Sequence, residues 1–352
     1  MGQRGWYKLA VETSGSLRIA VVGGVPAPLG GGGLETQARS TVAALQRRGH
    51  EVFHVEREPA ARPFDVLHAI GADIGVGHAL LNWRRNPAPL VLSPVIVVKP
   101  GVWEWRQWMM GHLPIPLFGP HVRHQLVRMA NLVVAQTDHE AHLIRTWSLP
   151  ARPEIIVIPN GVEPLPAREP PPGLPAGYVL LLGAISRRKR QQQTLAELGR
   201  SGIPAVVAGG FEGSSRERAR FEATVQEAQG LWLGEVNDRE TVAGLLRGAR
   251  ALVHLSSAEG QSLAVIESLS VGTPALISPL PANRELAARY PDLVRLVSSA
   301  EAIPQALAEL PDHRRPAAVA TWEEVASRLE RQYRNLVDKD RTSLARAAPG
   351  ST

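Results

Sequence analysis

Apolar residues along the chain follow two alternating patterns: short runs of strand length and longer stretches with helical spacing. The short runs are rich in Val, Ile and Leu and are bounded by glycine, proline or polar residues, which is typical of buried strands. In the first half of the chain, the predicted strands cover residues 17–22, 51–55, 66–68, 90–98, 132–136 and 155–158. In the second half they cover residues 178–182, 205–208, 231–236, 251–255, 274–278 and 293–297. Strands that alternate with helices in this way predict an α/β fold with parallel sheets.

A proline-rich stretch separates the two series of strands. Residues 164–176 can continue neither a helix nor a sheet, because proline has no amide donor, so they are predicted to form a linker. We therefore expect an N-terminal domain over residues 1–163 and a C-terminal domain over 177–320. An amphipathic helix over 321–338 is expected to pack back on the N-terminal domain, followed by a flexible tail over 339–352. Two Rossmann-like, doubly wound domains of this kind would face a cleft that binds ligands.

Composition narrows the classes of function. The chain has 352 residues and no cysteine, which excludes thiolate catalysis, thiolate metal ligands and disulfides. Lysine and arginine exceed aspartate and glutamate by 39 − 33 = 6, which fits anionic partners such as phosphates or acidic lipid headgroups without choosing between them. No apolar run reaches the ~18 residues that span a bilayer. We expect a cytoplasmic protein, at most in peripheral contact with the inner face of a membrane.

The most informative stretch follows the predicted strand 251–255 and reads EGQSLAVIE over residues 259–267. Glu259 falls in the turn between strand and helix, and Glu267 falls inside the helix on an apolar strip, where a carboxylate needs a hydrogen-bonding partner. Between them, the helix start offers free backbone amides near Gln261, Ser262 and Leu263, which favour a phosphate. The two acids and the anion seat together suit a nucleotide-sugar. The simpler alternative is an amphipathic helix with solvated glutamates.

The Glu-x7-Glu spacing and the following SLSVGTPALIS resemble the donor-site signature of the retaining glycosyltransferases of family 4, which have the GT-B fold. The resemblance implies transfer of a hexose-type sugar from a nucleoside diphosphate donor to an acceptor, with retention at the anomeric carbon. It also implies that Glu259 is catalytic and contacts the donor sugar, whereas Glu267 binds the nucleotide ribose.

A second motif, LLGAISRRKR over residues 181–190, places four cations directly after a predicted strand. It resembles the family's basic pair at the positions of Arg188 and Lys189, which implies that both bind the donor diphosphate and that Lys189 stabilises the leaving phosphate. Many family members also have arginine where this chain has Ala184. The alternatives are a solvated helix start and a nucleic-acid patch, and we expect no nucleic acid as a partner.

The N-terminal half carries weaker signals. The glycine-rich loop before the helix at residue 34 resembles the family's first loop, which implies that Gly32 and Gly33 approach the donor and that Glu35 lies on the acceptor side. The strand end DVLH, which contains His68, also resembles the corresponding strand end of the family. This resemblance implies that His68 lies on the acceptor side. A flexible surface turn and a structural histidine are the alternatives. Near Val95, many family members carry a histidine that contacts the sugar.

Two further stretches have chemistry-bearing side chains. The run DHEAH over residues 138–142 has His-x-x-His spacing, and Thr137 with Glu140 predicts a capping box, so we expect no metal there. No Asp-x-Asp pair follows a strand, and no cofactor is expected besides the nucleotide-sugar substrate. Residues 103–128 are rich in Trp, Met, Arg and His. They could form an acceptor pocket, a membrane-contacting face or a buried helix.

Other functions remain open for this fold. One is a GT-B sugar-nucleotide epimerase or phosphorylase, and another is a carbohydrate-binding accessory protein whose catalysis has decayed. Turnover of a donor would separate the accessory protein from the enzymes. The sequence does not determine the donor base, the sugar, the acceptor, the linkage or the oligomeric state.

Overall fold

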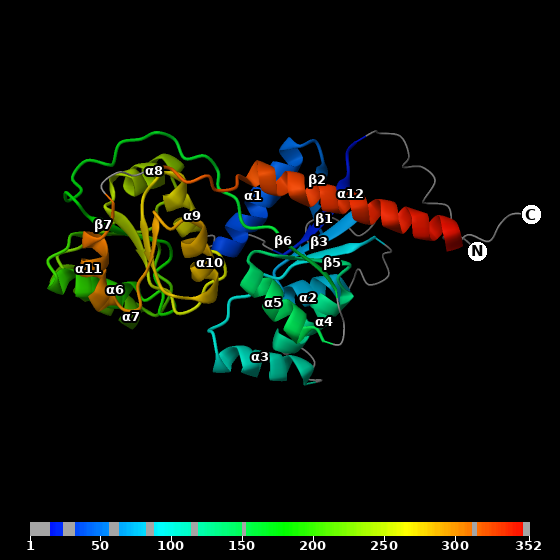
Figure 1. Ribbon diagram of the computed structural model, residues 1–352, viewed down its shortest axis with the longest axis horizontal. Coiled ribbons are helices and arrows are strands. Elements are labelled where there is room, and N and C mark those ends of the chain that lie inside the picture. The colour runs from blue at the N-terminus through cyan, green and yellow to red at the C-terminus, as the bar shows by residue number, and fades with distance from the viewer. Residues whose placement is uncertain are drawn as a thin grey trace, which may run out of the picture.

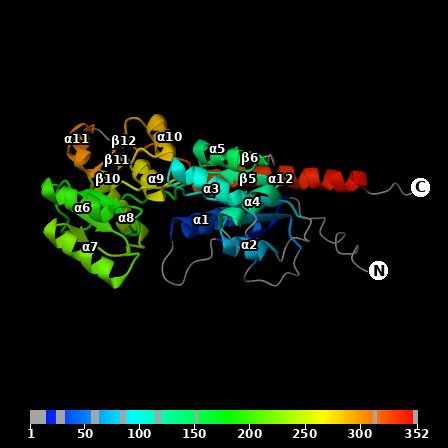
Figure 2. The same ribbon diagram turned by 90° about the horizontal axis from the view of Figure 1, so that it is seen from below.

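The computed structural model describes residues 15–23, 32–55, 63–81, 88–113, 119–149, 153–311 and 315–347. It contains two parallel sheets with helices on both faces, at opposite ends of an elongated molecule (Figures 1 and 2). The prediction of two doubly wound α/β domains is confirmed. Both faces of the central strands are buried, which explains why these strands are continuous apolar runs instead of alternating ones.

The N-terminal sheet has the strand order β2-β1-β3-β4-β5-β6. Its strands are β1 Arg18–Val22, β2 Glu51–His54, β3 Val66–Ile70, β4 Leu90–Ser93, β5 Leu132–Ala135 and β6 Glu154–Val157. Its helices are α1 Gly33–Arg47, α2 Ile74–Leu81, α3 Val102–His112, α4 Gly119–Met129 and α5 Asp138–Trp147. One core lies on each face of the sheet, since Ile19 and Val21 belong to one cluster and Ala20 and Val22 to the other.

The C-terminal sheet has the strand order β12-β11-β10-β7-β8-β9. Its strands are β7 Val179–Leu182, β8 Ala205–Ala208, β9 Leu231–Trp232, β10 Ala251–His254, β11 Ala275–Ile277 and β12 Val294–Leu296. Its helices are α6 Gln191–Arg200, α7 Ser215–Glu227, α8 Arg239–Gly248, α9 Leu263–Ser270, α10 Pro281–Arg289 and α11 Ile303–Ala308. The order reverses between β7 and β10, and ligands bind at such a switch point, outside the carboxyl ends of the strands.

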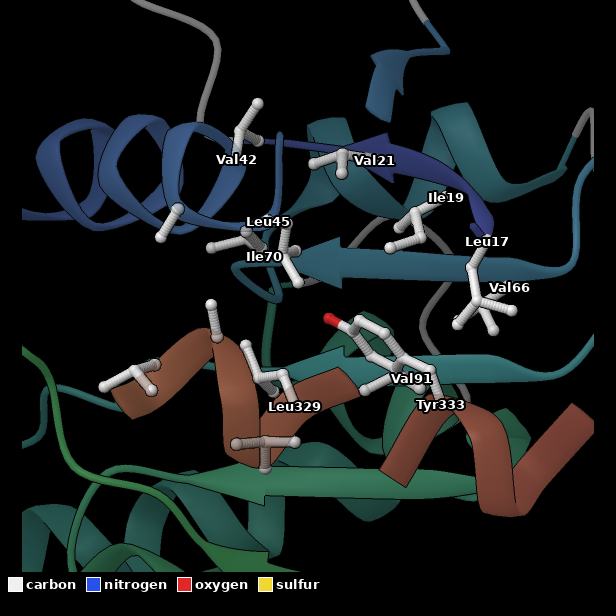
Figure 3. Packing of buried hydrophobic residues seen from close by; sticks show 14 of the residues in the cluster. Leu17, Ile19, Val21, Val42, Leu45, Val66, Ile70, Val91, Leu329 and Tyr333 are labelled. Carbon is white, nitrogen blue, oxygen red and sulfur yellow. The ribbon is translucent and has the colours of Figure 1, made fainter. Parts of the chain in front are cut away.

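The last helix, α12 Trp322–Ala347, returns to the N-terminal domain (Figure 1). Its apolar side, including Val325, Leu329 and Tyr333, packs against β1, β3 and α1 in a single core (Figure 3). The helix continues to Ala347 instead of ending at 338, because no glycine or proline interrupts it before Pro349.

Two segments, one predicted as a strand and one as a linker, differ from these predictions. The predicted strand 90–98 ends at Ser93, because Pro94 cannot donate to the ladder and Val95 has a positive φ of 51°. The proline-rich segment packs on α8: Arg247 donates to the carbonyl oxygens of Leu165 and Pro166. The chain crosses between the domains instead where Val162 pairs with Thr321.

Candidate active site

A carboxylate with several partners lies at the carboxyl end of β10. Glu259 Oε1 is 2.8 Å from Arg188 Nη1 and 3.0 Å from His254 Nε2, and it accepts from Ser256 Oγ at 2.9 Å. Burial would raise the pKa of Glu259, but the hydrogen bond and charge of His254 and the charges of Arg188 and Lys189 outweigh it and lower the pKa to about 2. Glu259 is therefore ionised over the whole physiological range of pH.

The loops after β7 and β10 meet at the switch point because these two strands are parallel neighbours. Ser257 N donates to the carbonyl oxygen of Arg188 at 2.8 Å, and Arg188 Nη1 donates to the carbonyl oxygen of Ala258 at 2.9 Å. The two sequence motifs, separated by about seventy residues in the chain, thus form one continuous surface.

Lys189 lies half-buried beside this pair. Burial lowers the pKa of Lys189, an effect that Arg188 reinforces and Glu259 opposes. Gly183 makes room for the ammonium group, since a Cβ at that glycine would lie 2.7 Å from Lys189 Nζ. The other two cations are elsewhere: Arg187 is exposed and pairs with Glu217, and Arg190 has a left-handed backbone that begins α6.

The start of α9 faces the same loops. Ser262 is its N-cap, and its side chain makes no capping hydrogen bond, so the first-turn amides can donate to a ligand. Gln261 is partly engaged in a contact across the domains, because its Oε1 accepts from Asn160 N at 2.5 Å.

Glu267, one turn further along, has a partner that the sequence did not suggest. Its Oε1 is 2.5 Å from Nη1 of Arg239, the first residue of α8, and its side chain is 15% exposed. Arg239 also donates to the carbonyl oxygen of Glu163 at 3.3 Å. The buried position and the charged partner meet the requirement for a carboxylate on an apolar strip.

The N-terminal domain forms the opposite wall. A pocket between the domains is bounded by Glu259 and Gly260 on one side and by the segment after β4, with Ile96 and Val98, and the start of α5 on the other. The domains approach closely here, since a Cβ on Gly260 would lie 3.2 Å from Gln136 Oε1. The surroundings of Glu259 are therefore a cleft between domains.

The remaining N-terminal candidates lie at varying distances from this wall. Gly32 and Gly33 begin α1, which has no side-chain N-cap, and a Cβ on Gly32 would lie 2.8 Å from Glu35 Oε2. The preceding residues 24–31 lie outside the described part of the chain. In the buried part of α1, Gln37 Oε1 accepts from Gln136 Nε2 at 2.6 Å, which connects this helix to the wall.

His68 lies inside the N-terminal domain instead of at the cleft surface. It is 1% exposed; its Nε2 is 2.9 Å from Ser93 Oγ and its Nδ1 is 2.7 Å from the hydroxyl of Tyr333. Burial lowers the pKa of His68 to about 4, so the ring is neutral. These contacts favour the structural alternative, and an acceptor-side role for His68 gains no support from them.

The polar run at the start of α5 differs in part from the predicted capping box. Thr137 Oγ1 accepts from Glu140 N at 3.1 Å, as expected. The Glu140 carboxylate, however, accepts from Gln136 N and Ile96 N instead of Thr137 N. His139 pairs with Glu104 of α3 at 3.1 Å, and among the described residues no group of three or more acidic or histidine side chains is placed to hold a metal.

Comparisons with known proteins concern the family and the fold. Residues 172–315 match the family model described as "Glycosyl transferases group 1". The D-inositol 3-phosphate glycosyltransferase of Nocardiopsis dassonvillei is 32% identical over 43% of this chain and 41% of its own length, so the chain spans less than half of this curated relative in the match.

Solved structures extend the likeness to both domains. Sucrose-phosphate synthase from Thermosynechococcus elongatus superposes with a TM-score of 0.72 at 19% identity, covering 92% of this chain and 100% of that one. HepE of Anabaena, solved in complex with UDP-glucose, superposes with a TM-score of 0.60 at 16% identity, covering 94% of this chain and 99% of that one. OtsA superposes with a TM-score of 0.61 at 12% identity, covering 95% of this chain and 100% of that one. The chain therefore has the GT-B fold, and its residues 172–315 match the glycosyl transferases group 1 model.

Proposed function

We propose that this protein transfers a hexose-type sugar from a nucleoside diphosphate donor to an acceptor hydroxyl, with retention at the anomeric carbon and without a metal ion. The observation that carries the proposal is the contact of Glu259 with Arg188, beside Lys189, at the switch point of a glycosyl transferases group 1 domain. The group combines a buried anion, two cations and uncapped helix amides within one cleft.

The donor diphosphate would bind between Lys189, Arg188 and the amides near Gln261, Ser262 and Leu263. Lys189 supports this because burial disfavours its charge, and an anionic ligand would favour the charged form. The helix dipole of α9 adds a favourable potential for phosphate at the same place. Gly32 and Gly33, at the start of α1, would approach the phosphates from the other domain.

In the proposed reaction, the bond between the anomeric carbon and the phosphate oxygen breaks while the acceptor oxygen bonds to the same face of that carbon. The acceptor proton passes to the leaving phosphate oxygen. Lys189 and Arg188 stabilise the negative charge that develops on this phosphate, the usual source of a large rate effect. Ionised Glu259 accepts hydrogen bonds from the sugar hydroxyls, and Glu267 accepts from the ribose.

A second candidate is a carbohydrate-binding accessory protein. Ala184 and Val95 favour it, because an arginine and a histidine that the resemblance leads one to expect are missing at these positions. The two candidates differ in one measurable property. An accessory protein would release no nucleoside diphosphate from any donor.

Ligand-induced stabilisation tests the donor class. We expect one of UDP, GDP or ADP, or its sugar conjugate, to raise the melting temperature, since a ligand at 100 times its Kd stabilises by about 2.7 kcal/mol. Lys189→Ala should reduce the shift for the diphosphate more than for the bare nucleoside. The matched control is Arg187→Ala, an exposed cation of the same motif that pairs with Glu217 instead. No shift with any nucleotide would contradict the proposal.

We also propose that α3 contacts a membrane surface peripherally, from the cytoplasmic side. Trp103, Trp105 and Met109 are exposed on this helix, and Arg106 lies 4.6 Å from the ring of Trp103. α3 lies at the edge of the N-terminal domain, on the opposite side from α12 (Figure 1). Within the described ranges no helix is long and apolar enough to cross a bilayer. Tryptophan with flanking cations is typical of helices that lie in the interface of anionic lipids.

Vesicle co-sedimentation tests this contact. The wild-type protein should bind vesicles that contain an acidic phospholipid, and the double variant Trp103→Ser, Trp105→Ser should not. Leu149→Ser is the control, because Leu149 is equally exposed, at 49%, but lies after α5. Equal binding of both variants would contradict a role for α3.

A further inference from the structure

Glu140 lies buried between two segments of the N-terminal domain. Glu140 is 3% exposed, and each of its two carboxylate oxygens accepts a hydrogen bond from one backbone amide. Oε1 accepts from Ile96 N and Oε2 from Gln136 N, both at 2.7 Å. The first amide belongs to the segment after β4 and the second to the end of β5. One carboxylate therefore ties together the carboxyl ends of two neighbouring strands.

Both tied segments form the wall opposite Glu259. Ile96 and Glu140 line the pocket that Glu259 and Gly260 close from the other domain. A Cβ on Gly260 would lie 3.6 Å from the carbonyl oxygen of Ile96, so little space separates the wall from the loop that carries Glu259. A movement of the segment after β4 would therefore change the shape of the cleft next to Glu259.

This segment contains a strained residue. Val95 has a φ of 51°, a region that β-branched residues rarely adopt because of steric conflict with the backbone. Such strain persists only where the surroundings hold it, and it is concentrated at functional sites. The next peptide supplies Ile96 N to Glu140, so the hydrogen bond acts directly on the strained conformation.

We propose that Glu140 is a positioning residue for the reaction: it holds the strained segment at Val95 in the conformation that forms the cleft wall opposite Glu259. This inference rests on the proposed function, because it assigns Glu140 to the N-terminal side of the same cleft. Glu140 does not touch the reacting atoms and acts through the backbone at Val95 and Ile96.

The charge state of Glu140 makes this tie sensitive to pH. Burial raises the pKa of Glu140 to about 7, against the lowering effects of the two amide bonds and of Arg123 on α4. Glu285 on α10 raises it further, and the neighbouring His139 pairs with Glu104 on α3. When the carboxyl group is protonated, one of its oxygens becomes a hydrogen-bond donor. The hydrogen bond from one of the two amides is therefore weakened. The carboxylate, which holds both amides, therefore predominates above about pH 7, and the protonated form predominates below it.

The tie can be tested without measuring activity. In NMR spectra we expect the backbone amide signals of Ile96 and Gln136 to shift together as the pH passes through about 7. Glu140→Gln should abolish this common titration. Glu217→Gln is the matched control, because Glu217 also accepts a backbone amide at a helix start, from Ser214 N at 2.9 Å, but on α7. Signals that do not titrate in the wild type, or still titrate in Glu140→Gln, would overturn the proposal.

Its effect on the reaction is tested by donor turnover. Glu140→Gln should lower kcat about tenfold and leave the affinity for the nucleoside diphosphate within about twofold, because the nucleotide lies on the other domain. Adding Val95→Gly should restore most of kcat, since glycine adopts a positive φ without strain. A purely structural role in α5 would not be rescued in this way. Failure of the rescue, or an equal loss of nucleotide affinity, would overturn the proposal.

The single variant Val95→Gly provides a separate test if Glu140→Gln does not fold. Its kcat should depend less on pH below about 7 than the wild-type kcat, because the segment no longer needs the tie. An unchanged pH dependence would overturn the positioning role. Titrating amides in a protein that turns over no nucleotide-sugar would support the tie and would instead overturn the proposed function.

Discussion

At the scale of single residues, each acid of the candidate site is matched by a cation from another element. Glu259 on the loop after β10 contacts Arg188 on the loop after β7, and Glu267 on α9 contacts Arg239 on α8. Such a pair offsets the cost of removing a carboxylate from water, and a ligand can share either the cation or the acid. A ligand with hydroxyl groups and a diphosphate can do both.

Glu267→Gln tests the assignment of the ribose. The variant should bind the cognate nucleoside diphosphate more weakly by about 1.5–3 kcal/mol, the effect of losing a charged hydrogen bond. Arg239→Gln is the matched control, because it removes the cation of the same pair and leaves the carboxylate in place, so its effect should be smaller. Calorimetry that gives unchanged affinity in Glu267→Gln would remove Glu267 from the site.

Sequence motifs located the charged residues of the site but not all of their partners. Glu259, Arg188 and Lys189 could be singled out because each lies in a motif that directly follows a predicted strand. His254 and Ser256 have a local signal, since they are polar residues at and beyond a strand end. Arg239 has none, because it lies 28 residues before Glu267 at an ordinary helix start and meets it only when the chain folds.

At the scale of elements, α12 is held on the N-terminal domain by charge as well as by its apolar face. Glu330 is 2.7 Å from Arg48, the residue that directly follows α1, and 2.7 Å from Arg334 on its own helix. Burial would raise the pKa of Glu330, but the hydrogen bonds from Arg334 and Arg48 outweigh it and lower the pKa to about 2. The strands were predictable from apolar runs, whereas the end of α12 was predicted too early, because the polar continuation after residue 338 was interpreted as a tail although it carries no stop signal before Pro349.

Glu330→Gln should destabilise the protein at neutral pH by on the order of 1 kcal/mol, a figure reduced for solvent screening of a partly exposed network. Because the folded-state pKa is depressed, the contribution of Glu330 is present above about pH 4.5 and is lost as the pH falls toward about 2. Urea midpoints of wild type and variant should therefore converge in acid. Glu154→Gln, whose pair with Lys339 is exposed, serves as the control. A difference that stays constant with pH would contradict the role of ionised Glu330.

At the scale of the whole molecule, two crossings of the chain join the domains at one place. Val162 N donates to the carbonyl oxygen of Ala320, and Trp322 N donates to the carbonyl oxygen of Val162. From the sequence, the proline-rich segment was predicted to connect the domains. The prolines show where regular structure stops, but they do not show that this segment packs on α8. The contact between the crossings joins residues about 160 apart in the chain, and no local pattern predicts it.

Gly161→Ala tests this crossing. A Cβ at this position would lie 2.4 Å from Trp322 N, and backbone atoms cannot move aside as a flexible side chain can. We expect a loss of stability of about 1–3 kcal/mol, typical of overpacking. Gly119→Ala is the control, since a Cβ there has open space. Equal urea midpoints for the two variants would show that the crossing tolerates a side chain.

The central claim is that the cleft around Glu259 transfers a sugar from a nucleotide donor without a metal ion. The most direct measurement is the release of nucleoside diphosphate from a panel of nucleotide-sugars in the presence of EDTA, for wild type and Glu259→Gln. The wild type should release nucleoside diphosphate from one donor of the panel, and Glu259→Gln should still bind that nucleotide but release it on the order of 100-fold more slowly. Release that requires added magnesium or manganese, or a Glu259→Gln variant as fast as the wild type, would contradict the account.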